Sequence, residues 1–106
     1  MRLLILAAAA TLAFVSVPAY AKDLTFTLIN KSSVNVIELY VSPHSADEWG
    51  DNILTVEALK AGDKGNVTIT DGSAVCDYDL RLVTDSGVTA DATQNLCDKK
   101  TFTLRD

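Results

Sequence analysis

The chain has 106 residues, with nine basic residues against fourteen acidic ones and a formal net charge of −5. This charge disfavours nucleic acid and anionic membrane surfaces as partners, and the longest basic run is only Lys99-Lys100. The length suits one small domain rather than two.

The first 21 residues have the three parts of a signal peptide. Met1-Arg2 is a basic start, the fifteen residues from Leu3 to Val17 form an uncharged apolar block, and Ala19 and Ala21 occupy the positions that a signal peptidase reads. The block is shorter than the roughly 20 residues that cross a bilayer as a helix, and no comparable run follows it. We therefore predict a signal peptide over residues 1–21, a periplasmic or secreted location, and no membrane span in the mature chain.

Removing this segment leaves 85 residues (106 − 21), which we predict to be a single domain over residues 22–106. The domain keeps eight basic and fourteen acidic side chains, because Arg2 is the only charge removed. Its two cysteines, Cys76 and Cys97, enter an oxidising compartment and are predicted to form a disulfide. Neither belongs to a Cys-x-x-Cys pair of the kind that binds metal.

Two strands are predicted at the start of the domain. Residues 24–29 alternate apolar and hydroxyl side chains, and residues 30–33 have the composition of a turn. Residues 34–41 are also strand-like, but apolar side chains occupy both of their faces, which is typical of a central strand or of a β-bulge. We expect the two strands to pair as a hairpin.

The next part of the chain is a loop that allows at most one short helical turn, over residues 46–54. A turn is predicted at residues 62–65. The remaining predicted strands span residues 66–70, 75–83, 88–92 and 101–104.

Residues 75–83 show the clearest alternation in the chain. The side chains on one face are those of Cys76, Tyr78, Leu80 and Leu82, and the polar face holds Asp77, Asp79 and Arg81. Arg81 is two positions from Asp79, so we expect it to neutralise that carboxylate.

Six short strands separated by Gly, Asp and Asn turns predict an all-β fold, a small antiparallel β-sandwich or barrel of about six or seven strands with one disulfide. The disulfide either ties the start of the 75–83 strand to the approach of the last strand or bridges the two sheets.

The only histidine and the only tryptophan of the chain both lie in residues 42–54. His44 could act as a general base with Ser42 or Ser45, but there is no G-x-S-x-G element, and neighbours in one loop rarely converge. A small hydrolase is therefore the least favoured function. One histidine also cannot assemble the usual nitrogen-rich zinc site.

The same loop carries the hard oxygen ligands that calcium prefers. Asp47, Glu48, Asp51 and Asn52 are weak candidates for such a site, because their spacing departs from the EF-hand template. A calcium-stabilised or calcium-dependent ligand-binding β domain is the alternative function.

Trp49 has two interpretations. It either anchors its loop against the sandwich or forms an exposed platform for a ligand, with Tyr40, Tyr78 and nearby carboxylates as partners.

Several elements also resemble a known family. The stretches "LIN", "LYVSPHSADEWGDNIL", a Leu-x-x-Gly at residues 59–62, "CDYDLRLVTDSG" and "NLC" are similar to those of small exported proteins found mainly in proteobacteria and mostly uncharacterised. Some members carry the name argininosuccinate lyase by automatic transfer. We reject that name, because the lyase is a far longer helical tetramer. The resemblance implies a small exported domain and supplies no catalytic residues.

The sequence thus predicts an exported, non-catalytic binding or interaction module without a cofactor. Its partner is an unknown protein or small ligand, and its oligomeric state is left open. The candidate binding surface consists of His44, Asp47, Glu48, Trp49, Asp51, Asp77, Asp79 and Arg81.

Overall fold

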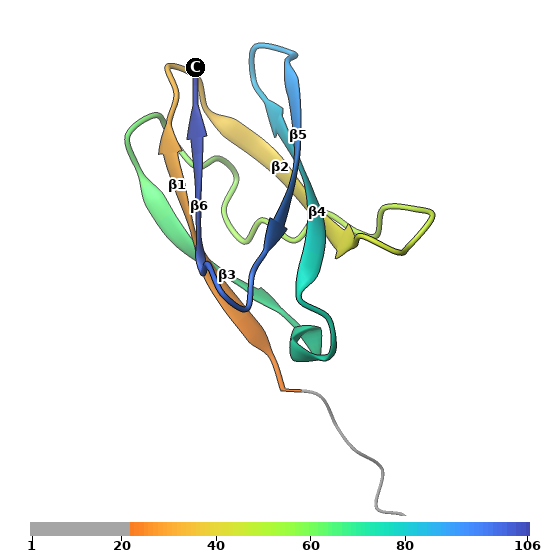
Figure 1. Cartoon of the computed structure of the whole chain (residues 1–106). Coiled ribbons are helices and arrows are strands. Elements are labelled where there is room, and N and C mark those ends of the chain that lie inside the picture. Colours follow the sequence, from red (N-terminus) through yellow and green to blue (C-terminus); the bar gives the residue numbers. More distant parts are fainter. Residues whose placement is uncertain (1–21) are drawn as a thin grey trace, which may run out of the picture.

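The computed structural model describes residues 22–106, and the predicted signal peptide lies outside them. Within this range six strands form two three-stranded sheets that pack face to face (Figure 1), which confirms the predicted all-β sandwich. The strands are β1 (Leu24–Lys31), β2 (Val36–Pro43), β3 (Lys64–Ile69), β4 (Asp77–Thr84), β5 (Thr89–Asn95) and β6 (Thr101–Arg105). One short 3-10 turn, Gly72–Ala74, precedes β4. No helix in the described part is long and apolar enough to cross a membrane.

The sheets have the strand orders β3-β1-β6 and β2-β4-β5. All pairs are antiparallel except β1 with β6, which run parallel. The predicted hairpin of the first two strands is wrong, because β1 and β2 belong to different sheets. The helical turn that the sequence allowed over residues 46–54 does not form, since only a bend at Asp47 and Glu48 is assigned there.

A buried asparagine explains why the chain leaves its sheet after β1. The Asn30 amide nitrogen donates to the carbonyl oxygens of Val34, at 2.8 Å, and Leu59, at 2.9 Å. Its amide oxygen accepts from the backbone nitrogen of Ser32 at 3.0 Å and from the Ser32 hydroxyl at 2.6 Å. Because these bonds meet the full needs of the buried amide, they stabilise a corner between the sheets in place of a tight hairpin.

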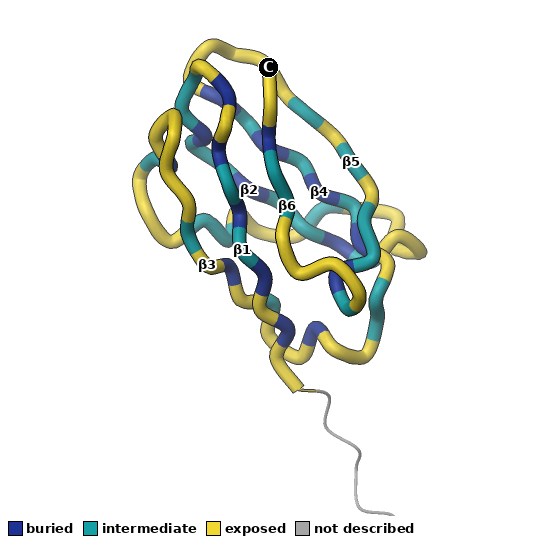
Figure 2. Tube along the Cα trace, turned by 60° about the vertical axis from the view of Figure 1, so that its left-hand side comes forward, coloured by how far each residue is buried: buried dark blue, intermediate teal, exposed yellow. Residues whose placement is uncertain are grey.

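The core lies between the two sheets and follows the alternation of the strands. Leu24, Phe26 and Leu28 of β1 point inward, and so do Tyr78, Leu80 and Leu82 of β4. Figure 2 shows the resulting alternation of buried positions with intermediate or exposed ones along β1 and β4. The remaining buried apolar side chains are Val36, Leu39, Leu59, Val67, Leu96 and Leu104.

The mixed pattern of β2 arises from a β-bulge, which is one of the two predicted explanations. The other, a central strand, is wrong, because β2 lies at the edge of its sheet. The register with β4 shifts between Val36 and Glu38, so Val36 and Leu39 are both buried although they are three positions apart. Beyond the bulge Tyr40 lies opposite Arg81, on the face turned away from the core. The bulge therefore sets which β2 side chains join the outer surface.

The disulfide between Cys76 and Cys97 is present, with its Cα atoms 5.1 Å apart. Cys76 directly precedes β4 and Cys97 follows β5, and the Leu96 backbone nitrogen donates to the Cys76 carbonyl oxygen at 2.9 Å. The bridge thus closes the open end of the β4–β5 pair and ties the start of β4 to the approach of β6. Of the two predicted arrangements, the first is correct.

Replacing both cysteines, Cys76→Ala/Cys97→Ala, is expected to lower the free energy of unfolding by about 3 kcal/mol. The reason is that the bridge closes a loop of 22 residues (97 − 76 + 1) and so restricts the unfolded chain. Urea unfolding followed by circular dichroism measures the change. The wild type in reductant should fall to the stability of the variant, whereas reductant should leave the variant unchanged. A loss below about 1 kcal/mol would contradict a stabilising role.

Candidate functional site

The outer surface of sheet β2-β4-β5 brings together most of the polar residues singled out in the sequence. Along β4 the side chains of Asp77, Asp79 and Arg81 point away from the core, while the register places Thr93 opposite Asp79 and Asp91 opposite Arg81. We call this surface, together with the loop after β2 whose His44 and Trp49 contact it, the acidic face. It consists of Glu38, Tyr40, Asp77, Asp79, Arg81, Asp91 and Thr93 from the strands and His44, Asp47, Glu48, Trp49 and Asp51 from the loop.

Arg81 lies at the centre of the acidic face. Its Nε and Nη2 atoms donate to the two carboxylate oxygens of Asp91, each at 2.8 Å. This two-point contact lowers the pKa of Asp91 below its ordinary value of 3.8. The predicted pairing of Arg81 with Asp79 is therefore wrong. A directly opposite residue on the neighbouring strand is closer than a residue two positions along the same strand, so the cross-strand carboxylate binds the guanidinium.

The Trp49 ring lies over this guanidinium, with the Arg81 Cζ atom 5.0 Å from the ring centroid. The ring is half-buried, on the outer side of the sheet and outside the core. Shallow hollows of about 340 and 300 Å³ flank it, one beside Tyr40 and Arg81 and the other beside His44, Asp79 and Thr93. Trp49 therefore rests on the sheet while one side of the ring stays accessible.

Tyr78 does not belong to this arrangement. Its side chain is buried in the core and its hydroxyl donates to the Gly72 carbonyl oxygen. The interpretation that grouped Tyr78 with Trp49 is wrong, because alternation along β4 turns it to the opposite face from Arg81. Tyr40 lies on the same outer face as Arg81, and its hydroxyl donates to the Glu38 carboxylate.

His44 forms an ion pair at the start of the loop. Its Nδ1 atom is 2.8 Å from Asp79 Oδ1, and the Thr93 hydroxyl donates to that same oxygen at 2.7 Å. The hydrogen bond to Asp79, followed by the charge of that carboxylate, raises the pKa of His44 above its ordinary value of 6.5. The Thr93 bond and then the His44 bond lower the pKa of Asp79 below 3.8.

This pair does not form the arrangement that a serine hydrolase needs. A nucleophilic hydroxyl would have to contact the histidine, with the carboxylate on the other ring nitrogen. Here the only hydroxyl in the network, that of Thr93, contacts Asp79, and no serine in residues 22–106 hydrogen-bonds His44. Ser42 is buried and lies opposite Asp79 in the β2–β4 register, and Ser45 is exposed; neither hydroxyl hydrogen-bonds the His44 ring.

The far end of the loop is fixed to β2. Asn52 Oδ1 accepts from the backbone nitrogens of Leu39, at 2.9 Å, and Leu54, at 3.0 Å, and the Ile53 nitrogen donates to the Leu39 carbonyl oxygen at 2.9 Å. Ile53 and Leu54 pack against the core. The apolar anchor of the loop is therefore this pair of residues, and Trp49 is free to cover the outer surface.

The weak calcium candidates are not assembled into a site. Asp47, Glu48 and Asp51 are exposed, and the Asn52 oxygen is already used by two backbone donors. Among residues 22–106 no group of three or more histidine, cysteine, aspartate or glutamate side chains could hold a metal ion.

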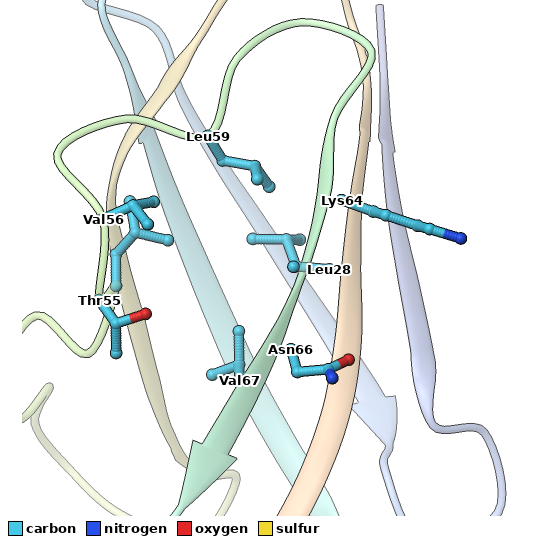
Figure 3. Close-up of a pocket in the computed structure, with 9 residues that line it drawn as sticks. Leu28, Thr55, Val56, Leu59, Lys64, Asn66 and Val67 are labelled. Atoms are coloured by element: carbon cyan, nitrogen blue, oxygen red, sulfur yellow. The ribbon is translucent and has the colours of Figure 1, made fainter.

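A separate apolar hollow of about 280 Å³ opens between β3 and residues 54–59. Figure 3 shows Leu28, Val56, Leu59 and Val67 around it, whereas the Lys64 amine points away. This hollow offers aliphatic contact without a charged group directed into it, and it lies apart from the acidic face.

Asp91 and Thr93 were not identified from the sequence as site residues. Their signal was the alternation of Thr89, Asp91 and Thr93 with alanines at positions 90 and 92. That pattern indicates a strand with a polar face, but it does not say which strand lies beside it. The pairing of β5 with β4 supplied the missing information.

The His44–Asp79 pair predicts a pH dependence. Because the pKa of His44 is raised in the folded state, protonated His44 stabilises the fold. This contribution is fully present below pH 6.5 and is lost as the pH rises through the raised pKa. Because the pKa of Asp79 is lowered in the folded state, the stability that ionised Asp79 contributes is fully present above pH 3.8. It is lost as the pH falls through the lowered pKa. The pair therefore holds the loop most firmly between pH 3.8 and pH 6.5.

An NMR titration of the His44 ring tests this interaction. We expect a midpoint above 6.5 in the wild type and a return toward 6.5 in Asp79→Asn, because that change removes the charged acceptor. Asp77→Asn is the control and should move the midpoint less, since Asp77 contributes the smallest effect. Equal midpoints in the wild type and Asp79→Asn would show that the pair does not form.

Comparison with known proteins supports the fold alone. No protein-family model matches the chain, and no curated protein matches it. A solved structure described as the NMR structure of a protein from Eubacterium rectale is similar, with a TM-score of 0.51 and 17% identity over 85% of this chain and 82% of that one. The family resemblance noted in the sequence stays a prediction.

Proposed function

We propose that this protein is an exported, non-catalytic binding module that docks a positively charged partner on its acidic face. The observation that carries the proposal is the uneven distribution of charge. The acidic face holds one guanidinium, that of Arg81, and seven carboxylates, those of Glu38, Asp47, Glu48, Asp51, Asp77, Asp79 and Asp91. The rest of residues 22–106 holds seven acidic residues (14 − 7) and seven basic ones (8 − 1), so its formal charge is zero.

This distribution supports recognition better than it supports solubility. Excess charge that only kept the protein soluble would have no reason to gather on one surface. Concentrated on one face, it steers a cationic partner to that face and raises the rate of association. Asp91 already neutralises Arg81, Asp79 is bound by His44 and Thr93, and Glu38 accepts from Tyr40. The exposed carboxylates of Asp47, Glu48, Asp51 and Asp77 remain for the partner.

Trp49 supports the same conclusion from the apolar side. A half-buried ring on the outer surface combines rigid apolar area with a polar edge, a combination enriched at interfaces. The shallow hollows beside it admit side chains from a partner without requiring the sheet to move.

The proposal treats the module as non-catalytic and exported. The contact of Thr93 with Asp79, in place of a hydroxyl on His44, supports the first point. The disulfide is consistent with an oxidising compartment, and with the predicted signal peptide it supports a periplasmic or secreted location. No observation favours the calcium alternative, because the loop oxygens are either exposed singly or engaged with backbone.

The sole tryptophan gives a direct assay. Titrating the exported protein with a peptide of ten lysines at low salt should change Trp49 emission saturably, and a glycine-serine peptide of equal length should not. The variant Asp47→Asn/Glu48→Gln/Asp77→Asn should weaken binding by about tenfold, because it removes three exposed carboxylates from the acidic face.

The matched control is Glu57→Gln/Asp63→Asn/Asp98→Asn, which removes the same charge from exposed positions elsewhere. It should retain nearly the wild-type affinity. Equal losses in both variants would mean that the peptide responds only to net charge, and the proposed face would be wrong.

A further inference from the structure

The outer surface of the other sheet, β3-β1-β6, has the opposite character. We call it the basic face. Its outward side chains are Thr25, Thr27, Ile29 and Lys31 of β1, Lys64, Asn66 and Thr68 of β3, and Thr101, Thr103 and Arg105 of β6. These strand side chains include three cations and no carboxylate, and the exposed Asp63 and Asp106 adjoin Lys64 and Arg105 in the chain.

The three cations lie at one end of the basic face. The register places Lys31 opposite Arg105, and Ile29, two positions before Lys31, lies opposite Lys64. None of the three takes part in an ion pair within residues 22–106. Figure 3 shows the Lys64 side chain extending away from the core.

The rest of the basic face is a regular polar surface. The hydroxyls of Thr25 and Thr68 are 3.1 Å apart, and the Thr27 hydroxyl donates to Asn66 Oδ1 at the same distance. These cross-strand contacts hold short side chains close to the sheet, so the face offers few long side chains that would have to be ordered on contact.

We propose that the basic face of one copy docks on the acidic face of a second copy of this chain. The two faces lie on opposite sides of the same sandwich, and their charges are complementary: three cations against six net negative charges (7 − 1). The contact uses the acidic face of the proposed function, but its test needs no external partner.

The size of the surface makes this association weak. At the usual strand spacing and rise per residue, a face three strands wide and about six residues long has roughly 300 Å² of flat area. A stable interface buries about 800 Å² on each partner. The contact therefore depends on charge pairing. At about 0.1 M salt the screening length is about 10 Å, so the net repulsion between two copies is reduced while charges in direct contact still attract.

Docking of one face on a different face is heterologous and does not close by two-fold symmetry. An assembly of any length then has a free acidic face at one end and a free basic face at the other. Association should therefore continue as the concentration rises instead of stopping at a dimer. Self-association and binding of a cationic partner then compete for the acidic face, and dilution after export favours the partner.

Sedimentation velocity on the exported protein tests the proposal, between about 20 µM and 1 mM and between about 0.05 and 0.5 M salt. We expect a mass that rises with concentration at low salt and a monomer at high salt. The variant Lys31→Gln/Lys64→Gln/Arg105→Gln should weaken association by about tenfold. The matched control Lys22→Gln/Lys60→Gln/Lys99→Gln removes the same charge from exposed positions outside the strands and should not.

A mixing experiment separates this geometry from any other. The variant without cations on the basic face keeps its acidic face, and Asp47→Asn/Glu48→Gln/Asp77→Asn keeps the basic one. Mixed together, they should form a one-to-one complex that grows no further. A monomer at all concentrations, a closed dimer insensitive to both variants, or an equal loss in the lysine control would overturn the inference. Each outcome leaves the peptide-binding result for the acidic face unaffected.

Discussion

The two-point contact between Asp91 and Arg81 is the interaction on which the acidic face depends. The side chains of Asp91 and Arg81 are 52% and 38% exposed, so solvent screening leaves the pair itself little net effect on stability. Its effect is geometric. Two parallel hydrogen bonds hold the guanidinium in one plane, and a planar cation close to the sheet provides a surface on which the Trp49 ring can lie. Without Asp91, a mobile arginine would extend into solvent and the ring would lose its support.

The scaffold beneath this contact has little freedom. The β4–β5 pair is closed at one end by a turn containing Gly87, whose φ of +87° suits a residue without a side chain, and at the other by the disulfide. A slip of one residue would turn Asp91 inward and Ala90 outward, and the fixed ends prevent it. The loop above is held separately, by His44 on Asp79 at its start and by Asn52 on Leu39 at its end.

Local patterns predicted the parts of the fold that depend on neighbouring residues. The alternation in residues 75–83 correctly separated the buried side chains of β4 from its polar ones, and the two cysteines, taken with the predicted signal peptide, correctly predicted the disulfide. The main failures concern partners distant in sequence, whereas the grouping of Tyr78 with Trp49 went against the alternation within its own strand. The hairpin of β1 and β2 and the partner of Arg81 depend on which strands adjoin, and so does the choice between the two interpretations of Trp49. The buried contacts of Asn30 that divert the chain give no periodic signal.

The central claim is that Trp49 lies on Arg81, outside the core, and so completes a binding surface. The Arg81 side-chain proton shifts, measured by NMR, test it most directly. Stacking under the indole ring should move the Arg81 Hδ and Hε signals upfield of their unstructured values, and Trp49→Leu should abolish the shift while leaving the core signals of Leu39 and Leu80 in place. Unshifted Arg81 protons, or changes in core methyl signals in Trp49→Leu, would show that the ring lies elsewhere and would contradict the account.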